Sequence, residues 1–255
     1  MRKIKLLLEY DGTDYRGWQI QKTGLTIQGI LEGKIVQITG NKSSVIGASR
    51  TDAGVHALGQ VAVFRTEAYL FTERIKGALN ALLPQDIRIL DVSEVDDSFH
   101  PRHNARRKIY FYIISDQKRS SAFLHKYTWG VKHPLEIRSM TEAAQYLLGK
   151  HDFSSFQGTG SDIRNPVREI FSLGIDRLEE IDFMTARIKG EFIKISIEAD
   201  GFLRHMARNI VGTLVEVGRR RKSSYHMEEI LKSNDRKLAG QNAPAHGLFL
   251  EKIEY

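Results

Sequence analysis

The chain has 255 residues, 41% of them hydrophobic, and it contains no cysteine. A chain without cysteine forms no disulfide, has no thiolate nucleophile and cannot build a cysteine-ligated zinc site. No apolar run approaches the roughly 20 residues that span a membrane. The short apolar run after the basic N-terminus does not make a signal peptide, so we expect a cytoplasmic protein.

The net charge of +7 is unevenly distributed. Residues 1–104 carry 13 Lys and Arg against 12 Asp and Glu, whereas residues 105–255 carry 25 against 19. A basic surplus on one half is typical of proteins that bind a polyanion, most often nucleic acid. Charge alone fits a basic protein with no such partner equally well.

The first half alternates strands and helices. Hydrophobic periodicity and turn signals predict these elements: a strand over 4–8, a helix over 27–38 with Thr26 as its N-cap, a strand over 60–64, a helix over 70–83 stopped by Pro84, and a strand over 87–92. This order indicates an α+β fold.

The second half opens with a basic linker, 99–108, that leads into a predicted strand over 109–114. Side chains alternate across a strand, so Tyr110 and Tyr112 share one face. Two tyrosines beside several cations can stack on bases. The alternative is that both rings pack in the core with their hydroxyl groups at its rim.

Further elements are expected along the rest of the chain. They are an irregular stretch over 115–138, a helix over 140–148 capped by Ser139 or Thr141, a polar loop over 151–168, strands over 169–175, 183–189 and 191–199, and a helix over 206–217. On that last helix we expect Arg204 and Arg208 one turn apart on one face. The basic run 219–222 is either a solvated loop or a phosphate contact.

The segment 192–201 echoes 3–12, because both read as strands that end in Glu-x-Asp-Gly. This echo suggests two related α+β halves, 1–104 and 105–255, that meet at a cleft.

The loop over 47–57 holds Asp52 two residues after Arg50, between Gly47 and Gly54. Glycine permits tight backbone turns and the close approach of a ligand. The arrangement indicates a single carboxylate presented beside a guanidinium. The alternative is an ordinary exposed turn, since Asp and Gly are common turn residues.

Together these segments resemble the tRNA pseudouridine synthase A family over nearly the full length. The resemblance rests on ordered motifs: Tyr10-Asp11-Gly12-Thr13, Gly17-Trp18-Gln19, Arg50-Thr51-Asp52-Ala53-Gly54-Val55-His56-Ala57, Ala78-Leu79-Asn80, Phe99-His100-x-Arg102, Arg107-x-x-Tyr110, His205-Met206-x-Arg208-Asn209-Ile210-Val211-Gly212 and Ala243-Pro244-Ala245-x-Gly247-Leu248. The chain departs from the usual family pattern at Ser49, Ala207 and Arg220, which leaves every expected reactive group in place.

The resemblance implies two ferredoxin-like halves with joined antiparallel sheets and a central cleft, assembled as a homodimer. It implies isomerisation of uridine at tRNA nucleotides 38–40, with no cofactor and no metal. It assigns catalysis to Asp52 with Arg208 as its ion-pair partner. It further implies that Tyr110 packs on the base and that Arg50 holds the flipped nucleotide.

Other functions stay open on the residues alone. The chain fits an RNA-binding module without catalysis, and it fits a glycosidase if Asp11 or Asp14 supplies a second carboxylate near Asp52. The pair His100 and His103 has metal-like spacing, but its arginine-rich surroundings favour a role without metal.

Overall fold

The computed structural model describes residues 1–255 except 116–120, 159 and 161–164. The chain divides into an N-terminal unit, Met1–Arg106 with Phe249–Tyr255, and a C-terminal unit, Arg107–Leu248. Each is an α+β unit with a mostly antiparallel sheet. Parts of the predicted stretches 115–138 and 151–168 lie outside the described residues. Within those residues, no helix is both long and apolar enough to cross a membrane.

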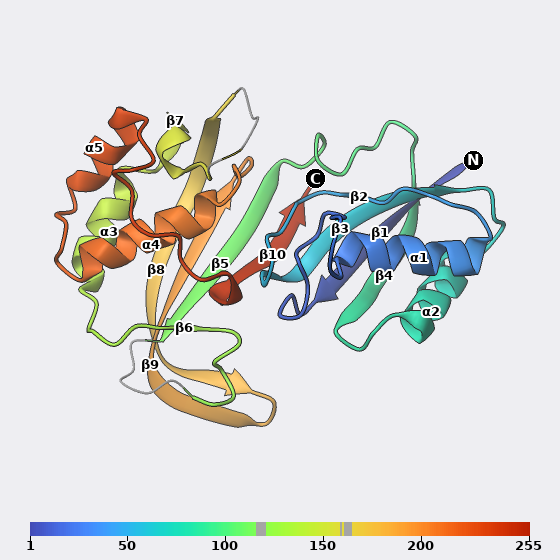
Figure 1. The fold of residues 1–255 in the computed structure, drawn as a ribbon, viewed down its shortest axis with the longest axis horizontal. Helices are drawn as coiled ribbons and strands as arrows, with labels where there is room; N and C mark the ends of the chain where they lie inside the picture. Colours follow the sequence, from blue (N-terminus) through green and yellow to red (C-terminus); the bar gives the residue numbers. More distant parts are fainter. Residues whose placement is uncertain (116–120, 159, 161–164) are drawn as a thin grey trace. The chain divides into compact units, whose positions relative to one another are not determined.

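In the N-terminal unit, β1 (Arg2–Tyr10) pairs antiparallel with both β3 (His56–Thr66) and β4 (Ile87–Val95). Two strands join β3: β2 (Ile46–Gly47) antiparallel and β10 (Leu248–Glu254) parallel. Helices α1 (Ile27–Thr39) and α2 (Thr72–Leu82) contact each other, and α2 packs on β4 (Figure 1). Alternate residues of β1 are buried, as period-2 patterning predicts.

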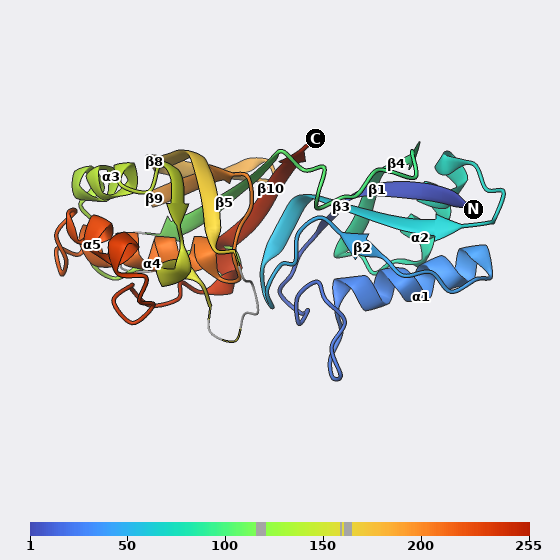
Figure 2. The same ribbon diagram turned by 90° about the horizontal axis from the view of Figure 1, so that it is seen from above.

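In the C-terminal unit, the antiparallel order is β5 (Arg107–Ser115), β9 (Ala186–Ala199), β8 (Val167–Phe183) and β7 (Gly149–Asp152). A short β6 (Trp129–Gly130) runs parallel to β5. Helix α3 (Ile137–Gln145) contacts α4 (Met206–Gly218) and α5 (His226–Ser233), and Figure 2 shows the three helices together. Short 3₁₀ turns occupy Ser154–Phe156 and Ala245–Gly247.

The helix boundaries in the N-terminal unit agree closely with the sequence. The Thr26 side chain accepts a hydrogen bond from the Gly29 N–H at 3.3 Å, which confirms the predicted N-cap. Helix α2 ends at Leu82, just before Pro84. The residue before a proline is disfavoured in the helical region, so the helix stops there.

Helix α3 starts earlier than predicted, and the predicted caps Ser139 and Thr141 are wrong. Its N-cap is Glu136, whose carboxylate accepts from the N–H groups of Arg138 at 3.1 Å and Ser139 at 2.7 Å. The apolar stripe begins only at Met140. No residue of the first turn is buried, although it begins with Ile137, so the pattern did not show the true start.

The predicted strand over 183–189 is not one strand, because the chain reverses at Met184 and Thr185 and 186–189 belong to β9. Strand β8 continues to Phe183 and β9 begins at Ala186, with Met184 at φ 56° in the turn. Every residue of the far arm, 176–191, is exposed or half-buried, and the apolar alternation continues on both sides of the turn, so the pattern does not mark where the chain reverses. The predicted irregular stretch contains β6, and α5 was not predicted at all.

Arg204 does not share a helical face with Arg208, contrary to the expectation from spacing. His205 caps α4 in the left-handed region, at φ 62°, so Arg204 precedes the helix. Arg208 lies in the first turn of α4.

Two helical glycines should respond in opposite ways to alanine. Gly77 in α2 has nothing within 4 Å of an added Cβ, so Gly77→Ala should raise the free energy of unfolding by about 0.5–1 kcal/mol. A Cβ on Gly212 in α4 would lie 1.7 Å from the Gln241 carbonyl oxygen. Gly212→Ala should therefore cost about 3 kcal/mol or more. Denaturant melts of both variants test this, and equal shifts would contradict the packing of α4.

Candidate active site

The loop that carries Asp52 is fixed to β3 by one buried side chain. Gln60 is fully buried, and its amide accepts from the Ser49 N–H at 3.1 Å and donates to the Ser49 carbonyl oxygen at 2.8 Å. The Ala48 N–H also donates to the Val61 carbonyl oxygen at 2.8 Å. The backbone of Ala48 and Ser49, immediately before Arg50, is therefore hydrogen-bonded along β3.

A buried tyrosine extends this network to the next residue of the loop. The Tyr10 hydroxyl lies 2.8 Å from Thr51 Oγ1 and 3.3 Å from Gln60 Nε2. Burial raises the pKa of Tyr10 to about 12, although its hydrogen bonds to Thr51 and Gln60 oppose the shift. Tyr10 is therefore neutral at physiological pH and acts as a fixed hydrogen-bonding group.

The N-terminal loop closes over the other side of the Asp52 loop. The Trp18 N–H donates to the Thr51 carbonyl oxygen at 3.0 Å, and the Gly54 N–H donates to the Tyr15 carbonyl oxygen at 3.3 Å. Gly17, at φ 86°, would place a Cβ 2.6 Å from that Thr51 oxygen. A Cβ on Gly47 would lie 2.4 Å from the buried Trp18 ring. Only glycine fits at both contacts.

Asp52 lies at a tight turn, where its carbonyl oxygen accepts from the Val55 N–H at 3.1 Å. It is half-buried, whereas Arg50 is exposed. Asp52 therefore does lie in a turn, as the alternative interpretation of the sequence predicts. This turn is not an isolated one, because β3 and the N-terminal loop both form hydrogen bonds with the loop that contains it. The structure brings Arg50 and Asp52 together in the N-terminal unit.

Asp11 and Asp14 also lie in the N-terminal loop that packs on the Asp52 loop. An Asp11 oxygen lies 3.1 Å from His56 Nδ1 and accepts from the Thr13 N–H at 2.9 Å. Asp11 therefore serves local structure, while Asp14 is exposed.

The linker after β4 supplies a residue that we did not single out from the sequence. Arg102 is half-buried, and its Nε donates to the Gly47 carbonyl oxygen at 2.9 Å. Burial lowers the pKa of Arg102, and the charge of Arg50 lowers it further. The motif Phe99-His100-x-Arg102 contains this arginine and is the sequence signal from which it could have been selected.

His100 and His103 lie ring against ring, with centroids 4.2 Å apart. His100 Nδ1 accepts from the backbone N–H groups of Arg102 at 3.1 Å and His103 at 3.3 Å. These contacts give the pair a role in shaping the linker. In the described part of the chain, no three His, Asp or Glu side chains gather in a way that would hold a metal ion.

In the C-terminal unit, Tyr110 and Tyr112 are both buried, which matches the packing alternative. The Tyr110 ring meets Phe202 edge-on, with centroids 4.8 Å apart. The Tyr112 hydroxyl donates to the Pro244 carbonyl oxygen at 2.8 Å. Burial raises the pKa of Tyr112, and the positive charge of Arg208 acts against that shift.

Arg208 is half-buried on α4 and is held by the loop before β10. Its Nε donates to the Ala243 carbonyl oxygen at 2.7 Å, and its own carbonyl oxygen accepts from the Ala243 N–H at 3.2 Å. Arg208 is therefore a positioned side chain rather than a solvated one. Tyr110 and Arg208 belong to the C-terminal unit, and Asp52 and Arg50 to the N-terminal unit.

The basic run 219–222 is tied down by local acceptors. Arg219 and Arg221 both approach Glu216, at 3.5 and 3.4 Å, and Lys222 Nζ donates to the Leu238 carbonyl oxygen at 2.7 Å. Arg220 is exposed at φ 58°. A non-glycine residue in this left-handed conformation costs about 1–2 kcal/mol.

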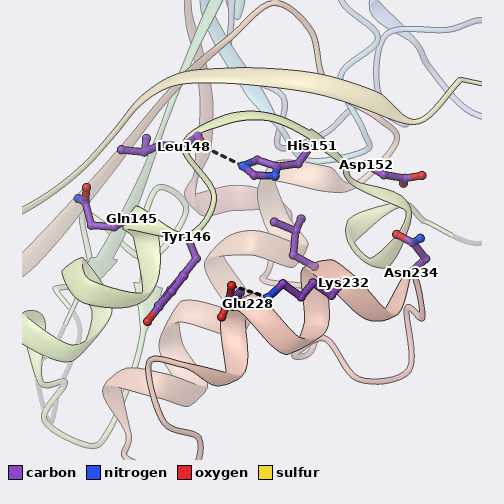
Figure 3. Close-up of a pocket in the computed structure, with 9 residues that line it drawn as sticks. Gln145, Tyr146, Leu148, His151, Asp152, Glu228, Lys232 and Asn234 are labelled. Atoms are coloured by element: carbon purple, nitrogen blue, oxygen red, sulfur yellow. Dashed lines mark hydrogen bonds and ion pairs between the residues drawn. The ribbon is translucent and has the colours of Figure 1, made fainter.

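A separate pocket of about 460 Å³ lies between α3, β7 and α5 (Figure 3). It contains none of the predicted site residues. Lys232 pairs with Glu228 at 2.6 Å, and a His151 ring nitrogen lies 2.7 Å from the Leu148 carbonyl oxygen. Because these polar groups are paired with one another, we do not assign the pocket to the reaction.

The raised pKa of Tyr10 predicts how stability depends on pH. Between pH 10 and 12 the unfolded chain loses the Tyr10 proton while the folded chain keeps it, so the free energy of unfolding falls as pH rises. Tyr10 should account for roughly 3 kcal/mol of that fall. Denaturant melts across this range should show a shallower fall for Tyr10→Phe, and an identical slope would contradict the burial of Tyr10.

Comparison with known proteins identifies the family. The model of the family described as "tRNA pseudouridine synthase" matches residues 7–104 and 143–255. Proteins named tRNA pseudouridine synthase A are 45% identical in Thermoanaerobacter sp. and in Acetivibrio thermocellus, and 42% identical in Thermodesulfovibrio yellowstonii. Each of these matches covers the whole of both chains. The chain therefore belongs to the tRNA pseudouridine synthase family.

Proposed function

We propose that the protein isomerises uridine to pseudouridine in the anticodon stem-loop of tRNA, at nucleotides 38–40, without a cofactor. Membership of the tRNA pseudouridine synthase family supports the reaction. The observation that carries the proposal is the Asp52 loop, in which Gln60 and the N-terminal loop hold one carboxylate beside Arg50.

The reaction breaks the bond between uracil and ribose, turns the base and rejoins it through C5. No water has to attack, because the departing base stays in the product. One ionised carboxylate is enough, either as a nucleophile toward sugar or base or as a base that takes a sugar proton. In this proposal Asp52 has that role, and Arg208 pairs with it to favour the charged form.

Reaching the bond requires the uridine to leave its stack, at a cost of a few kcal/mol. We assign Arg50, which is exposed next to Asp52, to hold the flipped nucleotide. Tyr110 packs on the base, since the ordinary pKa of tyrosine, about 10, makes it a poor base. Two ferredoxin-like halves, 1–104 and 105–255, with joined sheets and a cleft between them would bring these groups together, in a homodimer that binds tRNA.

Two rival functions remain distinct from this one. An RNA-binding module without catalysis would bind tRNA and leave it unmodified, and a glycosidase would release free uracil. The basic C-terminal half supports tRNA binding in either case. Family membership and the braced Asp52 loop favour the synthase.

The carboxylate should be indispensable. We expect Asp52→Asn to lower the single-turnover rate of pseudouridine formation by about 10³-fold or more, because an amide neither attacks nor takes a proton. Asp14→Asn removes an exposed carboxylate from the adjoining loop and should leave the rate unchanged. Chemical mapping of pseudouridine in tRNA measures both. Equal yields of pseudouridine from wild type and Asp52→Asn would contradict the proposal. Release of free uracil would identify a glycosidase.

Tyr110 should act through its ring rather than its hydroxyl group. Tyr110→Phe keeps the ring and its edge contact with Phe202, so the rate should stay within a few fold of wild type. Tyr110→Leu loses the stacking surface, which is worth about 1–3 kcal/mol per base, and the rate should fall roughly 10–100-fold. Single-turnover kinetics separate the cases. A Phe variant as inactive as the Leu variant would assign proton transfer to the hydroxyl group instead.

A further inference from the structure

We propose that Arg102, together with Arg50, binds a backbone phosphate of the RNA next to the target uridine. The inference rests on the proposed function and adds a substrate-binding residue to it. Its basis is the position of the Arg102 guanidinium against the start of the Asp52 loop.

The guanidinium is held at a defined place. Arg102 Nε donates to the Gly47 carbonyl oxygen at 2.9 Å, and Gly47 packs directly on the buried Trp18 ring. Gly47 precedes Arg50 by three residues and Asp52 by five. Because Nε makes this bond, the two terminal nitrogens of the fork are left for another acceptor.

The charges around this position favour an anion. In the described part of the chain, neither Arg50 nor Arg102 forms an ion pair with an acidic side chain. The pKa of Arg102 is lowered by burial and by the charge of Arg50, so the two cations repel each other. Guanidinium groups nevertheless stay protonated in proteins. A single anion between them would relieve the repulsion and restore hydrogen bonds lost on burial.

Neighbouring groups add to the positive potential. The pKa of His100 is lowered by burial and then by the charges of His103, Arg102 and Lys3. The acid nearest to Arg102 in sequence, Asp97, already pairs with Arg65 at 2.7 Å. Asp52, two residues after Arg50, is the carboxylate that the proposed function assigns to the reaction, so the phosphate is expected beside Arg102 and Arg50 and not beside Asp52.

The chemistry of the fork selects phosphate. A planar guanidinium whose two terminal nitrogens are both left to donate matches a phosphate bidentately, whereas lysine offers only a point charge. Phosphate contacts set the register of a nucleic acid on a protein. A phosphate bound next to the Asp52 loop would place the flipped uridine opposite that carboxylate.

The test combines a protein change with an RNA change. Full-length tRNA is assembled with a neutral methylphosphonate replacing the phosphate on the 5′ or the 3′ side of the target uridine. Wild type, Arg102→Gln and Arg102→Lys are compared, and Arg74→Gln serves as the control because Arg74 is exposed on α2. Filter binding gives Kd, single-turnover assays give the rate at saturation, and circular dichroism checks the fold.

We expect one of the two methylphosphonates to raise the wild-type Kd by about tenfold, and Arg102→Gln to raise it equally on normal tRNA. When Arg102→Gln is assayed on that methylphosphonate tRNA, Kd should rise no further than it does with either change alone. Arg102→Lys should fall between wild type and Arg102→Gln. The salt dependence of binding should weaken by roughly 0.7–0.9 in log–log slope for Arg102→Gln only.

Two results would overturn the inference while leaving the proposed function intact. In one, Arg102→Gln keeps the full wild-type penalty for both methylphosphonates. In the other, it slows the saturated rate with Kd unchanged on every RNA, which would reduce Arg102 to a brace for Gly47. If wild type forms no pseudouridine in normal tRNA, the proposed function and this inference fail together.

Discussion

The buried amide of Gln60 is the interaction on which the candidate site depends. It satisfies both backbone groups of Ser49 and also reaches Tyr10, which in turn contacts Thr51. An unpaired buried polar group costs about 1–3 kcal/mol. Loss of the Gln60 side chain would leave the backbone groups of Ser49 without these hydrogen bonds and would remove one partner of the Tyr10 hydroxyl. The backbone before Asp52 is consequently fixed to the sheet by buried hydrogen bonds, and catalysis depends on groups that are held in place in advance.

Positive charge in both units of the chain is held by specific contacts rather than merely abundant. Arg102 is tied to Gly47, Arg208 is tied to Ala243, and the run after α4 is occupied by Glu216 and local carbonyl groups. In the proposed function, the overall surplus of +7 attracts RNA from a distance. The fixed guanidinium groups would then determine where the RNA binds. This division explains why the most basic run of the sequence is not the part we assign to the substrate.

The sequence predicted the regular elements well where one face is apolar. Strand β1 and helices α1 and α2 follow their hydrophobic patterns, and Thr26 and Pro84 mark helix ends by local chemistry. Prediction failed where the hydrophobic pattern does not mark a boundary. Glu136 caps α3 ahead of its first buried residue, and in the β8–β9 hairpin the alternation continues across the turn. Asp52 and Arg50 were assigned from their motif. The contacts of Gln60 and Arg102 could not be predicted, because their partners are far away in the sequence: Tyr10 lies 50 residues from Gln60, and Gly47 lies 55 residues from Arg102.

The central claim is that the Asp52 carboxylate acts on a uridine drawn out of the tRNA. A crystal structure of the protein with bound tRNA tests it most directly. The account predicts a uridine of the anticodon stem-loop turned out of its stack, with its ribose within van der Waals contact of the Asp52 carboxyl group. A tRNA whose uridines all remain stacked, or an extruded uridine bound far from Asp52, would contradict it.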